Sequence, residues 1–240
     1  MALIKQMVLF ILFPEVGFRR EVQKRKVTKF KLLYSIGINF VLPWFFLLIG
    51  LFIYTNEPLK KQLQKHELTK VTVFLDDYGR YIPIPFVLFL DKFGLQARSP
   101  IAVRVIGLAA AYVVGDFIVY RTKKLSQEAR PQDHGLHNSF PSQHTSLAFL
   151  AATSLHHQYI GSRGGMAVSA AGMLSASGVG YLRFARDSHW SCDVLVGAAV
   201  GMMSVNIIYS FLWGLIELLV VQVWLFLKRI FYKRKMELDL

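Results

Sequence analysis

The sequence predicts an all-α integral membrane protein, a six-transmembrane-helix bundle with an N-terminal amphipathic segment. Of its 240 residues, 54% are hydrophobic and 18% are charged, and the mean hydropathy is +0.40. The apolar residues fall in long runs, and about 20 apolar residues in a row are what a helix needs to cross a bilayer. Several such runs recur, which argues against a buried helix of a large soluble protein.

Six apolar runs follow one another along the chain. The clearest is Leu32 to Tyr54, and a short one that carries Asp91 covers about Tyr81 to Leu95. The others are expected at about 101–120, 144–155, 164–182 and 190–213. The sequence shows no internal repeat or low-complexity linker, so residues 32–213 are predicted to form one membrane domain.

The two ends of the chain are basic, and this sets the expected orientation. Residues 1–31 combine an apolar stretch with a basic tract and lack a small-residue cleavage site, so a helix on the membrane surface is predicted rather than a signal peptide. Residues 214–240 are expected to form a helix extension and a second basic tail. With six spans, both termini lie on the cytoplasmic side, as the positive-inside rule expects.

The opposite face also carries basic residues, which the positive-inside rule does not explain. They include Lys123, Arg130 and Arg183. The net charge of +13 lies in part at the two basic ends of the chain, which would be attracted to anionic lipid headgroups. The outer residues are either solvated groups and headgroup anchors, or they neutralise a phosphoryl group. An anionic ligand on this face would give them a common reason.

A histidine and a carboxylate, His189 and Asp193, stand four residues apart, close to Arg183. On a helix both face the same way, and a carboxylate that accepts one ring N–H leaves the other nitrogen unprotonated and nucleophilic. The alternative is a structural pair that ties a helix end. The guanidinium of Arg183 suits a phosphate or carboxylate and favours the catalytic interpretation.

The run SFPSQHTS, residues 139–146, places His144 at the start of an apolar helix. Ser142 has the chemistry of an N-cap, and the first helical turn leaves backbone N–H groups facing outward. An anion held there meets those donors and the positive end of the helix dipole, and His144 can protonate a departing oxygen. An ordinary capped helix with an interfacial histidine is the alternative.

Three short patterns, taken in order, resemble the signature of the type-2 phosphatidic acid phosphatase superfamily. They are Lys123-x6-Arg130-Pro131, Pro141-Ser142-Gln143-His144 and Arg183-x5-His189-x3-Asp193. The resemblance covers about residues 70–210. Each pattern is loose alone, but all three on one side of a six-span chain are specific. The runs LDDYGRYIPIP and SFPSQHTSLAF are similar to the lipid A 4′-phosphatase-like branch of bacterial lipid phosphatases.

The resemblance implies a role for each position. His189 attacks phosphorus and forms a phosphohistidine, while Asp193 orients its ring. His144 protonates the leaving alkoxide and then acts as the base for water. The phosphate is held by Lys123, Arg130, Ser142, Gln143 and Arg183. The family needs no metal, and we expect no cofactor.

Two positions depart from the family pattern. Gln143 stands where the family usually has glycine, and Leu182 stands where it usually has the serine before the arginine. Glycine allows close backbone approach to phosphate, whereas a glutamine adds an amide that can touch the substrate. Loss of the serine removes one hydroxyl contact. Both departures bear on turnover and substrate choice rather than on where the site lies.

Other histidines have simpler interpretations. Asp133, His134 and His137 share an outer loop, and we interpret them as a polar loop because their spacing matches no strong metal signature; a metal site is the alternative. His156 and His157 are expected at the interface near the cytoplasmic end of the fourth span.

Two acidic residues and the single cysteine complete the titratable groups of interest. Asp116 lies late in the third span, where it needs a partner, and it is expected to share a helix face with Lys123. Glu128 is expected to form a surface pair with Lys124. Cys192 is the single cysteine, which excludes an intrachain disulfide.

The sequence thus predicts a metal-independent lipid phosphatase of the bacterial cytoplasmic (inner) membrane, with its active site facing the periplasm. The 4′-phosphate of lipid A is the expected substrate. Undecaprenyl pyrophosphate, phosphatidylglycerophosphate and phosphate transfer to a second lipid are the alternatives. A non-enzymatic lipid-binding or transport protein is the alternative of a different class. The expected partners are a phospholipid, lipid A or polyprenyl phosphate substrate and the bilayer, without nucleic acid, and the oligomeric state is left open.

Overall fold

The computed structural model describes residues 29–64, 78–132 and 135–210, and the regular elements in these ranges are all helical. The all-α prediction is confirmed for this part of the chain. The N-terminal amphipathic segment and the C-terminal tail fall outside the described residues apart from the first turn of α3.

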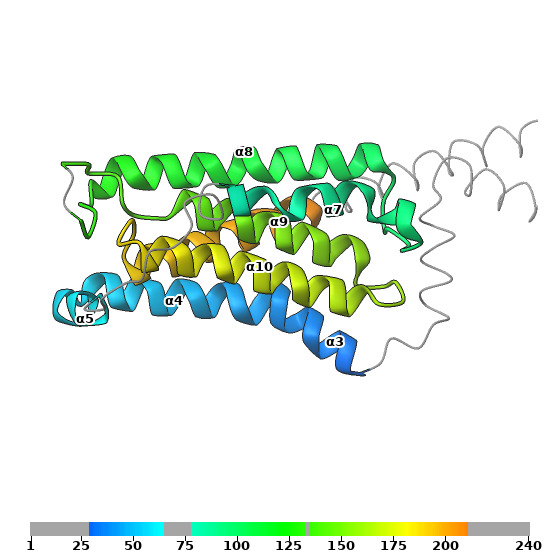
Figure 1. The fold of residues 1–240 in the computed structure, drawn as a ribbon, viewed down its shortest axis with the longest axis horizontal. Helices are drawn as coiled ribbons and strands as arrows, with labels where there is room; N and C mark the ends of the chain where they lie inside the picture. The colour runs from blue at the N-terminus through cyan, green and yellow to red at the C-terminus, as the bar shows by residue number, and fades with distance from the viewer. Residues whose placement is uncertain (1–28, 65–77, 133–134, 211–240) are drawn as a thin grey trace, which may run out of the picture.

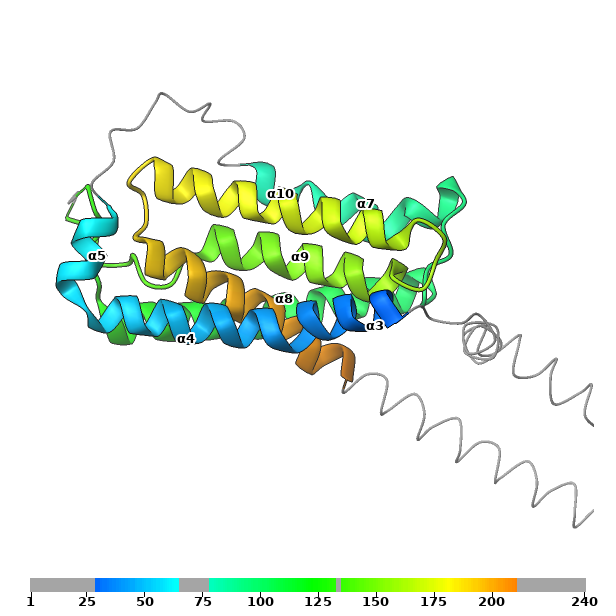
Figure 2. The ribbon, with the colours of Figure 1, turned by 90° about the horizontal axis from the view of Figure 1, so that it is seen from below.

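The long helices lie side by side along the longest axis of the molecule (Figure 1 and Figure 2). The first rod consists of α3 (Lys29–Ile36), the π-helical turn η1 (Gly37–Val41) and α4 (Leu42–Thr55). The short elements are α5 (Glu57–Leu63), η2 (Gly79–Tyr81), α7 (Pro83–Phe89) and η3 (Leu90–Phe93). The remaining helices are α8 (Ile101–Ser126), α9 (Gln143–Tyr159), α10 (Gly165–Ala185) and Ser191–Ser210.

Four described helices are long and apolar enough to cross a membrane, namely Leu33–Thr55, Ile101–Ser126, Gly165–Ala185 and Ser191–Ser210. The other two predicted spans form shorter elements. The second becomes α7 and η3, and the fourth becomes α9, which has 17 residues. At about 1.5 Å per residue, α9 is roughly 26 Å long and falls short of the ~30 Å hydrocarbon core. The six-span count therefore stays a prediction.

Asp91, the charge inside the second predicted span, is held by α8. Two guanidinium nitrogens of Arg104 lie 3.1 and 2.6 Å from its two carboxylate oxygens, and Arg104 also donates to the hydroxyl of Tyr159 at 2.8 Å. Arg104 is buried. A bidentate pair of this kind satisfies both charges inside the bundle, so Asp91 does not face lipid alone.

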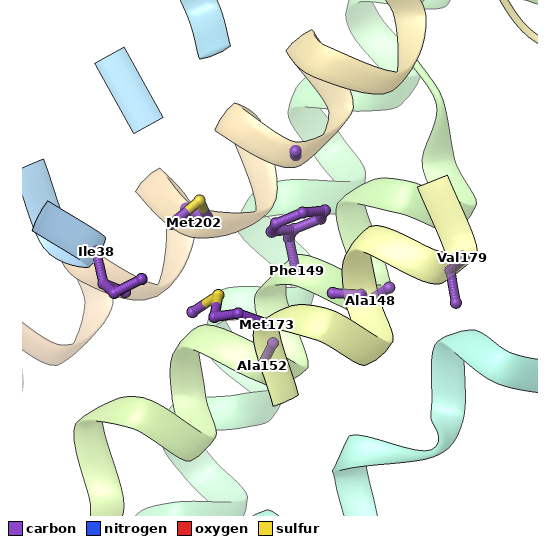
Figure 3. Packing of buried hydrophobic residues seen from close by; sticks show 9 residues of the cluster. Ile38, Ala148, Phe149, Ala152, Met173, Val179 and Met202 are labelled. Carbon is purple, nitrogen blue, oxygen red and sulfur yellow. The ribbon is translucent and has the colours of Figure 1, made fainter. Parts of the chain in front are cut away.

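Helix α9 lies at the centre of the bundle, where it contacts α7, α8 and α10 and is almost entirely buried. Its Phe149 meets Met173 of α10 and Met202 of the last described helix in the main core cluster (Figure 3). Glycine permits the last helix to come close, because a Cβ on Gly201 would stand 2.1 Å from the carbonyl oxygen of Ser146. Small residues at such contacts are typical of helices that pack in membranes.

The interfacial prediction for His156 and His157 is wrong. His156 is fully buried, and its ring nitrogens lie 3.1 Å from Ser35 Oγ and 2.8 Å from Ser169 Oγ. His157 is half-buried, with its Nε2 2.9 Å from Asn206 Oδ1. Each ring finds partners on neighbouring helices, so the pair ties α9 to its surroundings instead of facing headgroups.

Substitution of Gly197 tests the close packing of the last helix. A Cβ on Gly197 would lie 2.4 Å from the carbonyl oxygen of Ser142. We expect Gly197→Ala to reduce the free energy of unfolding by roughly 1–3 kcal/mol, because the backbone must shift. Thermal unfolding in one detergent measures the effect. Gly178→Ala on α10, where nothing lies within 4 Å of the added Cβ, is the control and should leave stability unchanged or raise it. Equal stability of the two variants would contradict this account of the packing.

Candidate active site

The loops that carry the three motifs lie at the same end of the bundle as α5. One loop connects α8 to α9 and the other connects α10 to the helix Ser191–Ser210 (Figure 1 and Figure 2). Because α8 and α10 end there while α9 and the last helix begin there, residues far apart in the sequence share one end. The motif residues are therefore placed by helix ends rather than by sequence proximity.

Ser142 caps α9, as predicted. Its hydroxyl accepts hydrogen bonds from the backbone N–H of Thr145 at 3.5 Å and from the Thr145 hydroxyl at 2.9 Å. The backbone N–H of Ser142 donates to the carbonyl oxygen of Asp193 at 2.9 Å. The serine is buried, so the side chain fixes the turn while its backbone ties α9 to the helix that carries Asp193.

His189 and Asp193 face each other inside the protein. His189 is 2% exposed and Asp193 is fully buried, and 3.4 Å separates His189 Nδ1 from Asp193 Oδ2. The same carboxylate oxygen accepts hydrogen bonds from the Ser139 hydroxyl and, at 3.0 Å, from the backbone N–H of Trp190. Since Asp193 faces Nδ1, the other ring nitrogen, Nε2, is the one left for chemistry.

The cations of the three motifs act on one another and on this carboxylate. Lys123 interacts electrostatically with Asp193, Arg130 and Arg183. Lys123 Nζ donates to the carbonyl oxygen of Asn138, and Arg130 Nε donates to the Asn138 side chain at 3.0 Å. Lys123 and Arg130 thus both contact the loop segment that leads into α9. A phosphate dianion bound there would relieve the repulsion between the two cations.

His144 joins the same group. It interacts electrostatically with Arg183, Arg80, His189 and Arg130. The two histidines that the sequence assigns to different motifs therefore stand within electrostatic reach of one another and of the same arginines. One small anion among them could meet a nucleophile and a proton donor together.

The pKa of His189 lies below its ordinary value of 6.5, mainly because burial penalises the imidazolium form. The hydrogen bond and the charge of Asp193 raise this pKa in part, whereas Lys123 and Arg183 lower it. Burial and then the Arg183 charge also lower the pKa of Arg130. His189 is consequently neutral at pH 7, which is the form a nucleophilic imidazole requires.

The two residues that depart from the family pattern, Gln143 and Leu182, lie in different surroundings. The amide of Gln143 donates to Asp116 Oδ1 at 2.6 Å, so the glutamine reaches across to α8. Helix α8 does continue past Lys123, but the partner that the structure gives Asp116 is Gln143 rather than the lysine. Leu182 is half-buried on α10, one residue before Arg183.

Three residues near the site escaped the sequence analysis. Ser139 bonds to Asp193 and lies 3.4 Å from His189 Nδ1. Arg80 acts on His144, and its Nε is buried without a hydrogen-bond partner among the described residues. Lys60 is buried below the loops. Lys60 and Arg80 come from segments outside the motifs, whereas Ser139 begins the run SFPSQHTS. The runs SFPSQHTS and LDDYGRYIPIP, which contain Ser139 and Arg80, were the available signals.

Lys60 contacts residues of both loops that carry the motifs. It forms ion pairs with Glu128 and, at 3.0 Å, with Glu57, and it stands 4.7 Å from the centre of the Trp190 ring. The predicted pair of Glu128 with Lys124 is wrong, because α8 ends before Glu128 with Gln127 in the left-handed region at φ 44°. The helical spacing on which that pair depended is therefore lost.

The described residues do not supply the set of side chains that a metal site would need. His137 is exposed, Asp133 and His134 lie outside them, and in the described part of the chain no three metal-binding side chains come together.

Comparison with known proteins shows what part of the chain is similar to. Residues 104–217 match the profile described as the PAP2 superfamily. The chain is 36% identical over 132 residues to the lipid A 1-phosphatase of Porphyromonas gingivalis, and this alignment covers 54% of the chain but 28% of that protein. A solved structure, Aquifex aeolicus LpxE, is similar with a TM-score of 0.47 and 25% identity, covering 64% of this chain and 94% of that one.

All three motifs, from Lys123 to Asp193, fall inside the matched residues. The resemblance stated from the motifs is thereby confirmed: this part of the chain, residues 104–217, is similar to the PAP2 superfamily.

Proposed function

We propose that this protein is a metal-independent phosphatase that removes a phosphate from a membrane lipid through a phosphohistidine intermediate. The observation that carries the proposal is the gathering of His189, Asp193 and His144 within one group of cations. A neutral nucleophile, a proton donor and charges for the phosphoryl oxygens are what in-line phosphoryl transfer needs.

In the proposed reaction, His189 Nε2 attacks phosphorus while the bond to the lipid oxygen breaks. His144 gives its proton to that departing oxygen, and Asp193 accepts from Nδ1 as positive charge develops on the ring. Lys123, Arg130 and Arg183 compensate the charge of the phosphoryl oxygens. A water then attacks the phosphohistidine with His144 as base, releasing phosphate and restoring the free ring.

For the substrate, we propose lipid A. The similarity to a lipid A 1-phosphatase supports this class, although the matched segment is 28% of that protein. The motif runs favour the 4′-phosphate, whereas the relative is named for the 1-phosphate, and analysis of the product distinguishes the two positions. Undecaprenyl pyrophosphate, phosphatidylglycerophosphate and transfer to an acceptor lipid remain the alternatives within the family's chemistry.

We also propose that the protein resides in the bacterial inner membrane with the site facing the periplasm and both termini in the cytoplasm. The four candidate spans and the basic flanks support a multi-pass arrangement. A non-enzymatic lipid carrier would share these features, and turnover of phosphate distinguishes the two.

His189→Ala should abolish phosphate release. We expect the purified full chain to release phosphate from lipid A in a panel with undecaprenyl pyrophosphate and phosphatidylglycerophosphate, with EDTA present, and to form an acid-labile phosphoenzyme that the variant lacks. Mass spectrometry of the product assigns the 1- or 4′-position. Release that stops on adding EDTA would instead support a metal at the outer histidines.

The pH dependence should follow the two histidines. Because the pKa of His189 lies below 6.5, kcat/KM should hold through pH 6.5 and fall only at lower pH, as the ring gains a proton. Asp193→Asn removes an interaction that raises this pKa, so its acidic limb should move to still lower pH while kcat drops. Burial, and then the cations around His144, oppose its protonation until phosphate binds, so the alkaline limb should appear in kcat. An acidic limb above pH 6.5 would contradict these assignments.

Ser139→Ala tests a positioning role for this hydroxyl. The change removes one donor to Asp193, and we expect kcat to fall about tenfold with little change in KM. With one donor fewer, Asp193 should attract the imidazolium more strongly and move the acidic limb to higher pH. Ser126→Ala, which removes a hydroxyl bonded to the Phe140 carbonyl, is the control. Equal pH profiles in both variants would reduce Ser139 to a structural role.

A further inference from the structure

The bridge between Gln143 and Asp116 lies at the edge of the candidate active site. Gln143 stands between Ser142 and His144, and its amide donates to Asp116 Oδ1 at 2.6 Å. On α8, Asp116 precedes Lys123 by seven residues, two helical turns or about 10 Å. The bridge therefore joins the first turn of α9 to the part of α8 that lies within a candidate span.

A carboxylate in this place works against binding of an anion. Lys123, Arg130 and Arg183 attract phosphate, whereas Asp116 repels it, and an ionisable group inside a candidate span is costly and usually functional. Among the described residues, Asp116 accepts a hydrogen bond from Gln143 and from no other group, and the exposed Gln143 carbonyl accepts none. The pair presents acceptor oxygens to a molecule that enters the site.

One turn further from the site, the same two helices border an apolar cavity of about 250 Å³. Tyr112 lies four residues before Asp116 on α8, and Leu147 lies four residues after Gln143 on α9, so both share helix faces with the pair. Ile84 and Leu88 of α7 also line the cavity. Apart from Tyr112 the lining side chains are apolar, and a lining of this kind, one helical turn from the pair, fits the acyl chain of the substrate lipid.

We propose that Asp116 and Gln143 form a specificity-determining pair that binds a hydrogen-bond donor located between the acyl chain and the phosphate of the substrate. This inference rests on the proposed function and deepens it. The donor is a hydroxyl or amide N–H of a phosphorylated aminosugar lipid. Phosphatidic acid offers ester oxygens at that place, which leave the acceptors unsatisfied and face the Asp116 charge.

The ratio of kcat/KM for two lipids in the same mixed micelles tests the pair. The lipids are an N-acylated glucosamine 1-phosphate and dioleoyl phosphatidic acid. The wild-type protein should prefer the sugar lipid, and Asp116→Asn should reduce that preference about tenfold, chiefly by slowing the sugar lipid. Gln143→Gly should reduce it too, and the double variant should lose little more than the larger single loss, because the two residues act as one unit.

Glu57→Gln is the matched control. It removes one exposed negative charge at the same end of the bundle, away from the cavity, and should leave the ratio unchanged. Thermal unfolding checks that each variant is folded, and Gln143→Gly, which carries the residue usual in the family, serves if Asp116→Asn does not fold. Equal loss on both lipids, or no loss on either, overturns the inference while the phosphatase proposal stands.

Binding separates the two proposals. Affinities of both lipids for His189→Ala, with and without Asp116→Asn, report recognition without turnover. A preference for the sugar lipid that Asp116→Asn removes supports the pair even if the wild-type protein releases no phosphate, in which case the proposed function fails alone. Equal affinities of the two lipids for His189→Ala overturn the inference whatever the catalytic result.

Discussion

The arrangement of the site depends on one backbone contact, the hydrogen bond from the Ser142 N–H to the carbonyl oxygen of Asp193. It holds the first turn of α9 against the first turn of the helix Ser191–Ser210. The approach is possible because Gly197 has no side chain at the point where the Ser142 carbonyl lies. A single contact between two helix starts thus brings His144 into the same group as His189, and a bulkier residue at Gly197 would separate the two imidazoles.

The acidic groups around this contact have hydrogen-bond or ion-pair partners of their own. Glu128 and Glu57 form ion pairs with Lys60. Asp193 accepts hydrogen bonds from the Ser139 hydroxyl and the Trp190 backbone N–H. The two buried charges in this set, Lys60 and Asp193, therefore both have partners, as a low-dielectric surrounding requires. The indole of Trp190 also donates to the carbonyl of Ala129 at 2.9 Å, which connects the loop next to His189 with the loop before Arg130.

The motifs and the long helices were predictable because both are local properties of the sequence. Apolar runs marked α4, α8 and α10, and the spacing of His189 and Asp193 indicated that the two side chains interact, although His189 lies in the loop before the helix Ser191–Ser210 rather than on its face. Ser139, Arg80 and Lys60 were not predictable, since their roles arise from contacts between segments that are far apart in the sequence. The short lengths of α7 and α9 were not predicted either, for a related reason. Inside the bundle, neighbouring helices rather than lipid surround these short elements.

Asp193 shows how one buried carboxylate can serve both the resting site and the reaction. In the resting site it faces a neutral ring, because burial together with Lys123 and Arg183 outweighs its own tendency to raise the pKa of His189. In the proposed reaction, positive charge would develop on the ring as a bond to phosphorus forms, and the carboxylate is already in place to stabilise it. The interaction is then stronger in the transition state than in the ground state, which is the condition for it to accelerate the reaction.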